Sequence, residues 1–235
     1  MTALAQRSAD STTAGAEPRD PRTWEAAVRR VVRADRAELV DGSRDQRHRL
    51  VTTGVRHGAL QTAPGVGGGC DLSARPLVDL LVPALRARWE ADAAAAHGAL
   101  VDGADDASVL AEVMARFTGA ARGRTLWVAP FSSRVGEGPA LGVLATDSPL
   151  AVLALQDRAD TGVAAMARVD AGEPWTALVH SVRLPLVDEH CHALRDDVAW
   201  PAGPRWCGEL RGGAEVWTCG SPAVVSGLPW RAVDR

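Results

Sequence analysis

The sequence contains no lysine, isoleucine, asparagine or tyrosine, and phenylalanine occurs only twice. The missing residue types share AT-rich codons, which indicates a very GC-rich bacterial genome. All 26 basic residues are therefore arginine. Arginine is normally favoured over lysine where a planar guanidinium has to bind carboxylate or phosphate, but here it fills every basic position. An isolated arginine in this chain therefore does not by itself predict an anion site.

Long hydrophobic runs and abundant cysteine are also missing. No apolar stretch has the length of a membrane span, and no apolar segment at the N-terminus is typical of a signal peptide. Four cysteines in 235 residues are too few for a disulfide scaffold. The net charge of -3 gives no overall attraction to nucleic acid or to an anionic membrane. We expect a cytoplasmic protein with reduced thiols, without a membrane partner and with nucleic acid as an unfavoured partner.

Length and composition indicate one globular unit with a disordered start. Hydrophobic residues make up 46% of the 235 residues and charged residues 23%, which is enough apolar material for a substantial core. Residues 1–20 are rich in Ala, Ser, Thr and Asp without periodicity, and we predict a disordered tail there. Residues 21–235 are predicted to form a single α+β domain, with a helical first half packed on a mostly β second half. A doubly wound α/β sheet is the alternative.

Hydrophobic periodicity and capping residues predict the individual elements. Asp20 and Pro21 begin a helix that runs to about Asp35. Further helices are predicted from Pro76, from Asp105 or Asp106, and over 164–169. Short apolar runs bounded by turn residues predict strands; these lie at 37–40, 50–55, 59–62, 125–129, 150–155, 175–187, 215–218 and 223–225.

The densest cluster of reactive side chains is Asp188-Glu189-His190-Cys191-His192, followed by Cys207 and Cys219. In an extended strand, residues two apart face the same side, so His190 and His192 share a face. Two imidazoles and two thiolates are a zinc ligand set. We therefore expect His190, His192, Cys207 and Cys219 to bind zinc, although neither cysteine pair has Cys-x-x-Cys spacing. With an open coordination position the metal activates water, and Glu189 or Asp188 carries the proton.

Residues 186–192, Leu-Val-Asp-Glu-His-Cys-His, resemble the first metal motif of the amidohydrolase barrels. That motif follows the first strand of a barrel that needs about 200 residues or more. The sequence after His192 is too short to build the rest of such a barrel, so the resemblance is limited to the motif. We do not infer membership of that family from it.

Three classes of function remain open from the sequence. The leading hypothesis is a metal-dependent, zinc hydrolase-type enzyme acting on a small molecule. The second is a non-catalytic structural or regulatory protein with a closed zinc site or no metal. The third is nucleic-acid binding through the arginines between Arg29 and Arg56, which are diluted by interleaved acidic residues. The loop Gly65–Gly69 offers amides to a phosphate, but a flexible connection is the favoured interpretation and its role stays open.

Overall fold

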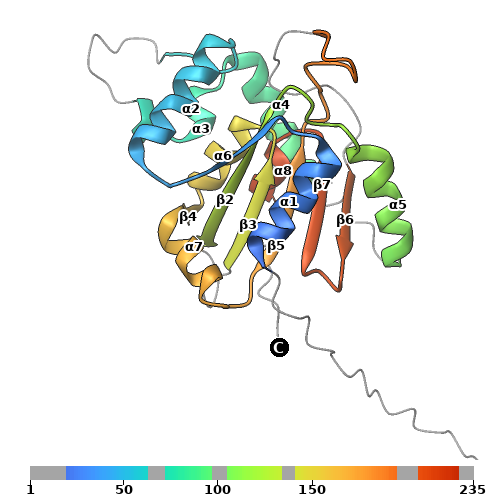
Figure 1. Ribbon diagram of the computed structural model, residues 1–235. Coiled ribbons are helices and arrows are strands. Elements are labelled where there is room, and N and C mark those ends of the chain that lie inside the picture. The colour runs from blue at the N-terminus through green and yellow to red at the C-terminus, as the bar shows by residue number, and fades with distance from the viewer. Residues whose placement is uncertain (1–19, 63–71, 97–104, 134–140, 195–205, 228–235) are drawn as a thin grey trace, which may run out of the picture.

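The computed structural model describes residues 20–62, 72–96, 105–133, 141–194 and 206–227. In this part of the chain seven strands form one mixed sheet (Figure 1). The order across it is β1-β2-β3-β5-β7-β6, and β4 pairs with the end of β2. The strands are β1 (Arg36–Leu39), β2 (Thr125–Ser133), β3 (Leu141–Thr146), β4 (Ala159–Thr161), β5 (Thr176–Ser181), β6 (Trp206–Leu210) and β7 (Glu215–Cys219).

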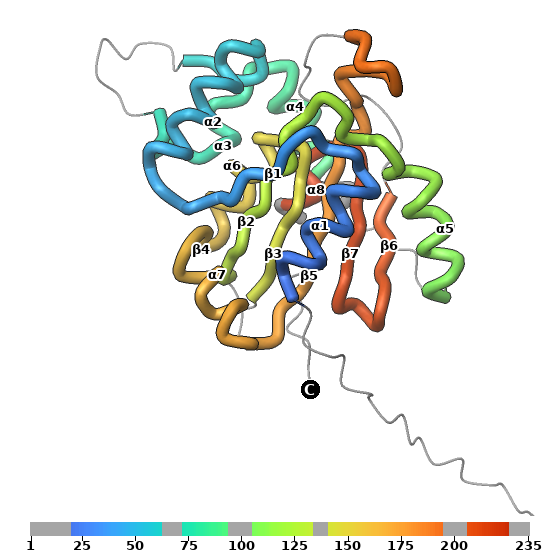
Figure 2. Tube along the Cα trace, in the orientation of Figure 1, coloured from blue at the N-terminus to red at the C-terminus, as the bar shows by residue number. Residues whose placement is uncertain are grey.

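Helices cover both faces of this sheet, as the trace in Figure 2 also shows. Helices α1 (Pro21–Val32), α5 (Asp106–Phe117) and α7 (Val163–Asp170) pack on one face. The other face is covered by α2 (Arg44–Arg56), α3 (Leu77–Leu80), α4 (Pro83–Ala96), α6 (Pro149–Gln156) and α8 (Ala223–Gly227), with a short 3-10 turn at Leu72–Ala74. The apolar side chains that these helices bury against both faces of the sheet are the main source of the protein's stability.

The mixed pairing confirms the α+β class. Strand pairs β1–β2, β3–β5 and β5–β7 are parallel. Pairs β2–β3, β2–β4 and β6–β7 are antiparallel. A doubly wound sheet shares the helices on both faces, but the antiparallel pairs exclude a uniformly parallel sheet. The predicted tail lies almost entirely outside the described residues.

Capping signals located several helices correctly. Asp20 accepts a hydrogen bond from the Thr23 amide at 2.8 Å, and Pro21 begins α1. Asp105 accepts one from the Ser108 amide at 2.9 Å at the start of α5. The helix predicted from Pro76 is instead two helices. Leu81 has an extended backbone between α3 and α4, just before Pro83 begins the second one.

Three predicted strands are helices. Residues 50–55 lie in α2, residues 150–155 in α6 and residues 223–225 in α8. In α6 every residue from Leu150 to Leu155 is buried, so its sequence is apolar on all sides and shows no helical period. The N-terminal signals of α6 are Ser148, which caps the helix, and Pro149 at its first turn. Strands β3, β4 and β6 were not predicted.

Two glycine turns touch backbone to backbone where α2 begins and β4 ends. Gly42 has φ +74° and Gly162 has φ +107°. A Cβ on Gly42 would overlap the Thr161 carbonyl, and one on Gly162 would overlap the Asp41 carbonyl. Both the left-handed backbone and this contact require glycine. The contact holds the start of α2 against the sheet.

None of the described helices combines the length and the apolar character that crossing a membrane requires. The cytoplasmic location stays a prediction.

Candidate functional site

Buried polar side chains gather at the carboxyl ends of the parallel strands β3, β5 and β7. Thr146 ends β3 and is followed by Asp147 and Ser148, His180 and Ser181 end β5, and Thr218 and Ser221 lie at the end of β7. All seven residues are at most 3% exposed. Ligands of open α/β sheets bind outside this edge of the strands. Buried polar groups require hydrogen-bond partners, so we expect the side chains of this cluster to be held in fixed positions.

Asp147 organises this edge. One carboxylate oxygen accepts the Ser181 hydroxyl at 2.7 Å, and the other accepts the Val182 amide at 2.9 Å. Burial raises the pKa of Asp147, and the nearby Arg124 guanidinium opposes that shift without reversing it. The carboxylate therefore links β3 to the end of β5.

His180 is held as a neutral imidazole with a defined tautomer. Its Nδ1 lies 3.1 Å from the Thr218 hydroxyl oxygen, and that hydroxyl donates its single proton to the Val179 carbonyl at 3.2 Å. Nδ1 must therefore carry the hydrogen, which leaves a lone pair on Nε2. Nε2 is buried without a hydrogen-bond partner in the described structure. Burial lowers the pKa of His180 to about 3, so the ring is neutral at pH 7.

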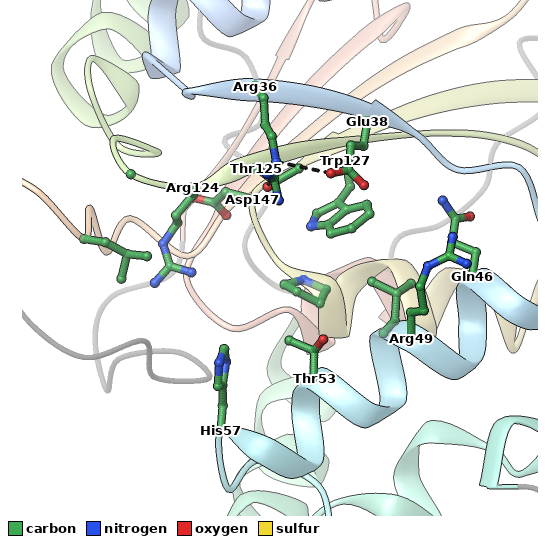
Figure 3. A pocket seen from close by; sticks show the side chains of 14 residues that line it. Arg36, Glu38, Gln46, Arg49, Thr53, His57, Arg124, Thr125, Trp127 and Asp147 are labelled. Carbon is green, nitrogen blue, oxygen red and sulfur yellow. Dashed lines mark hydrogen bonds and ion pairs between the residues drawn. The ribbon is translucent and has the colours of Figure 1, made fainter.

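A cleft of about 480 Å³ opens beside this edge (Figure 3). Its walls come from β1, the start of β2 and one face of α2, and its volume is within the range of small-molecule sites. Asp147 and Pro149 extend it to the carboxyl end of β3. The basic side chains in its lining are Arg36, Arg49, Arg124 and His57.

Helix α2 presents its side chains to this cleft at regular spacing. Arg49, Thr53 and His57 are four residues apart and therefore lie on one helix face. Arg47, two residues before Arg49, faces elsewhere. It donates to the carbonyls of Ser73 and Arg75 at 2.7 and 2.9 Å and to the Asp157 carboxylate at 2.6 Å. Arg47 thus fixes α2 to its neighbours and is not part of a solvent-facing basic surface.

The predicted zinc ligands lie in different environments. Cys207 packs in the hydrophobic core on one face of the sheet, and Cys219 packs in the core on the opposite face. Burial raises the pKa of Cys207 to about 12, and it also raises the pKa of Cys219. Neither thiol is prepared to act as a thiolate. The side chains of His190 and His192 are 72% and 76% exposed in a surface loop.

The loop that contains the two histidines is an ordinary turn. The Asp188 carboxylate accepts the amides of His190 and His192 at 2.8 and 2.9 Å. These amides, that of His192 foremost, lower the pKa of Asp188. Cys191, at φ +64°, occupies the left-handed position of the turn, and the Glu189 side chain is 70% exposed. The loop binds its own carboxylate internally and offers no enclosed site.

Comparison with known proteins decides the family. A family model described as the phosphoenolpyruvate carboxykinase N-terminal domain matches residues 23–222, a range that contains all seven strands of the described sheet. This chain belongs to that family. The match covers the whole described sheet and most of its helices, in contrast to the few residues of the amidohydrolase-like motif.

Individual carboxykinases are similar in sequence to this chain over shorter segments. The GTP-type phosphoenolpyruvate carboxykinase of Corynebacterium glutamicum (strain R) is 29% identical over 113 residues, which is 47% of this chain and 18% of the relative. The enzyme of Arthrobacter sp. (strain FB24) is 31% identical over 109 residues, 45% of this chain and 17% of the relative. That of Chlamydia trachomatis serovar D is 32% identical over 102 residues, 43% and 16%. The matched segments span less than a fifth of each relative.

The carboxykinase family overturns the zinc hydrolase hypothesis. The family model and the relatives carry the name of phosphoenolpyruvate carboxykinases, which are not hydrolases. Within the described residues no group of three or more His, Cys, Asp or Glu is placed to hold a metal ion. The zinc hydrolase hypothesis is therefore wrong, while the roles of Glu189 and Asp188 as proton carriers stay predictions. Cys70 and the loop Gly65–Gly69 lie outside the described residues.

The sequence offered only weak signals for the cleft. Arg49 and His57 are two of many arginines and histidines in the sequence. Only their position on α2 distinguishes them from Arg47, and residues 50–55 of that helix were predicted as a strand. Asp147 and His180 follow apolar runs at the ends of β3 and β5. Polar residues directly after buried strands are the signal that could have located this edge.

Proposed function

We propose that this chain acts as the amino-terminal lobe of a phosphoenolpyruvate carboxykinase-type enzyme and binds phosphoenolpyruvate at the carboxyl edge of its sheet. The observation that carries the proposal is the family match over residues 23–222, because it includes every strand that forms that edge. The relatives' names give phosphoenolpyruvate as the compound acted on and GTP as the nucleotide.

The geometry of the edge supports a binding role. The carboxyl ends of three parallel strands meet there, and their polar side chains are fixed by mutual hydrogen bonds. Fixed groups lose little entropy when a ligand binds. Phosphoenolpyruvate is anionic, and the basic side chains of this region, such as Arg124, favour anionic ligands.

The described residues offer no evident metal site. The relatives' names give GTP as the nucleotide, and within the described residues no group of three or more acidic, histidine or cysteine side chains is placed to hold a metal ion. The chain also has no lysine, which the Gly-Lys-Ser/Thr phosphate loop requires. In the proposal, metal and nucleotide are bound outside the described residues.

The proposal is tested by titrating phosphoenolpyruvate into the full chain and following hydrogen exchange of the backbone amides. We expect saturable binding and slower exchange in segments 146–148, 180–182 and 218–221, with the 188–192 turn unaffected. A parallel assay supplies phosphoenolpyruvate, bicarbonate, GDP and manganese ion and follows phosphoenolpyruvate consumption. The proposal would be contradicted if phosphoenolpyruvate showed no binding at millimolar concentration and was not consumed in the assay.

A further inference from the structure

Residues 182–186, called the strap below, connect the carboxyl edge of the sheet with the cleft. The strap begins directly after Ser181, the last residue of β5. At its other end the Leu186 amide donates to the Arg122 carbonyl at 2.8 Å, shortly before β2 begins. Strand β3 lies between β5 and β2 in the sheet. The strap therefore passes over the end of β3, where Asp147 lies.

At the carboxyl edge one buried carboxylate holds the strap. Asp147 accepts the Ser181 hydroxyl at 2.7 Å and the Val182 amide at 2.9 Å. The Ser181 oxygen in turn accepts the Arg183 amide at 2.9 Å. Asp147, Ser181 and Val182 are at most 2% exposed, so solvent does not compete for these bonds. The edge end of the strap is therefore fixed through consecutive residues.

At the cleft end the strap is held by residues that also line the cleft. The Arg124 side chain donates through Nε to the Leu184 carbonyl at 2.6 Å. Leu186 packs directly on Gly123, because a Cβ at position 123 would lie 2.9 Å from the Cβ of Leu186. Gly123, Arg124 and Leu186 all belong to the cleft lining. Anything that changes this wall of the cleft therefore acts on the strap.

The groups that hold the two ends are themselves close together. Asp147 and Arg124 lie on the wall of the cleft that faces α2 (Figure 3). The Arg124 guanidinium opposes the effect of burial on the pKa of the Asp147 carboxyl. Between the two attachments, Arg183 has φ +55°, a left-handed backbone that a residue with a side chain keeps only where its surroundings hold it. Arg183 is therefore the position at which the strap changes conformation most easily.

We infer that the strap couples the cleft to the carboxyl edge. A molecule that fills the cleft and displaces Leu186 loosens the Val182 and Arg183 amides at the edge, because five residues bound at both ends leave little slack. The occupant needs apolar contact with Leu186 and not a particular charge. The coupling does not depend on which ligand the edge binds; only its consequence, that the cleft regulates ligand binding at the edge, rests on the proposed function.

The test measures amide hydrogen exchange by NMR on the full chain without any ligand. Gly123→Ala places a methyl group against Leu186 from the cleft side. We expect the Val182 and Arg183 amides to exchange about tenfold faster or more. Gly172→Ala is the matched control, because Gly172 has φ +83° against +79° at Gly123 but no atom within 4 Å of the added Cβ. It imposes the same backbone strain and should leave both amides within about twofold of the wild type.

The reverse direction is tested from the edge, because coupling between two sites is reciprocal. Ser181→Ala removes the hydroxyl that accepts the Arg183 amide. The Leu186 amide at the cleft end should then exchange about fivefold faster or more. Ser221→Ala is its control. It also removes a buried hydroxyl at this edge, but one outside the strap, and should leave the Leu186 amide within about twofold of the wild type.

Each outcome decides the coupling. Unchanged exchange at Val182 and Arg183 in Gly123→Ala overturns it, and so does equal acceleration in Gly172→Ala, which indicates a general opening of the protein. If Gly123→Ala does not fold, the serine pair decides, and an unchanged Leu186 amide in Ser181→Ala overturns the coupling. No ligand is present in these measurements. A failure of phosphoenolpyruvate to bind or to be consumed therefore contradicts the proposed function alone.

Discussion

The turn at Asp188–His192 and the carboxyl edge of β3, β5 and β7 differ in how their chemistry is distributed. The turn concentrates five polar or reactive residues in five positions, and its two histidine side chains are 72% and 76% exposed. The edge draws Asp147, His180 and Thr218 from positions far apart in the chain and buries them at 2% exposure or less. Reactive side chains that are dense in sequence therefore do not mark the place where the fold encloses polar chemistry.

Of the substitutions considered, replacing Asp147 should lower the free energy of unfolding the most. Asp147→Ala leaves the Ser181 hydroxyl and the Val182 amide without their acceptor in a buried position. We expect the free energy of unfolding to fall by about 3–5 kcal/mol, measured by urea denaturation. Asp147→Asn keeps one acceptor oxygen and should cost less. A loss below 1 kcal/mol for Asp147→Ala would mean that the edge is no more structural than the turn.

Acid should act on the edge through His180. The pKa of His180 is about 3 in the folded protein and about 6.5 in an unfolded chain. The unfolded state therefore binds the proton first, and stability falls as the pH drops from about 6.5 towards 3, by at most about 1.4 kcal/mol per pH unit. His180→Leu removes this contribution. Urea titrations at several pH values should show a shallower acid dependence in the variant; identical slopes would contradict the buried neutral ring.

The turn should respond far less to the loss of its own carboxylate. Asp188→Ala removes the acceptor of the His190 and His192 amides. Solvent can replace that acceptor because the Asp188 side chain is 32% exposed. We expect a loss of stability much smaller than that of Asp147→Ala in the same urea experiment. A loss as large as that of Asp147→Ala would place the turn among the structural elements of the core.

Thiol reactivity distinguishes the exposed turn from the buried sheet, and it can be measured without a large change in protein stability. Cys191 is exposed in the turn, whereas Cys207 and Cys219 are buried and have raised pKa values. In the native protein a thiol reagent should modify Cys191 rapidly, and Cys207 and Cys219 only on unfolding. Cys191→Ser should remove a rapid phase at a cost below about 0.5 kcal/mol. Cys207→Ser should leave that phase unchanged, and a loss of the phase there would place Cys207 at the surface.

The sequence predicted the fold class because caps and amphipathic periods are local signals. Asp20 and Asp105 begin helices through side-chain contacts within the same turn. Segment 150–155 could not be assigned correctly because α6 is buried on all sides, so solvent imposes no period on its residues. The arginines were equally ambiguous. Arg47 and Arg49 have the same side chain two positions apart, and only the orientation of α2 makes one internal and the other part of a cleft.

The structure separates the two cysteines of the predicted metal site, and the strand register gives the reason. Cys207 pairs with Thr218, and Cys219 pairs with Trp206. Directly paired residues face the same side, and successive positions along a strand face opposite sides. The two thiols therefore belong to opposite layers, whatever their spacing along the chain. The cleft was missed because its lining comes from three elements whose approach depends on the order of strands in the sheet.

The paired glycine turns at Gly42 and Gly162 set a constraint on how this fold can vary. Each glycine leaves room for the main chain of the other segment, so a side chain can appear at one position only if the opposite turn is displaced. The two positions are therefore coupled through the space they share. In a set of related sequences we expect them to be retained together or lost together, and their joint loss should coincide with a lengthened connection before α2 or after β4.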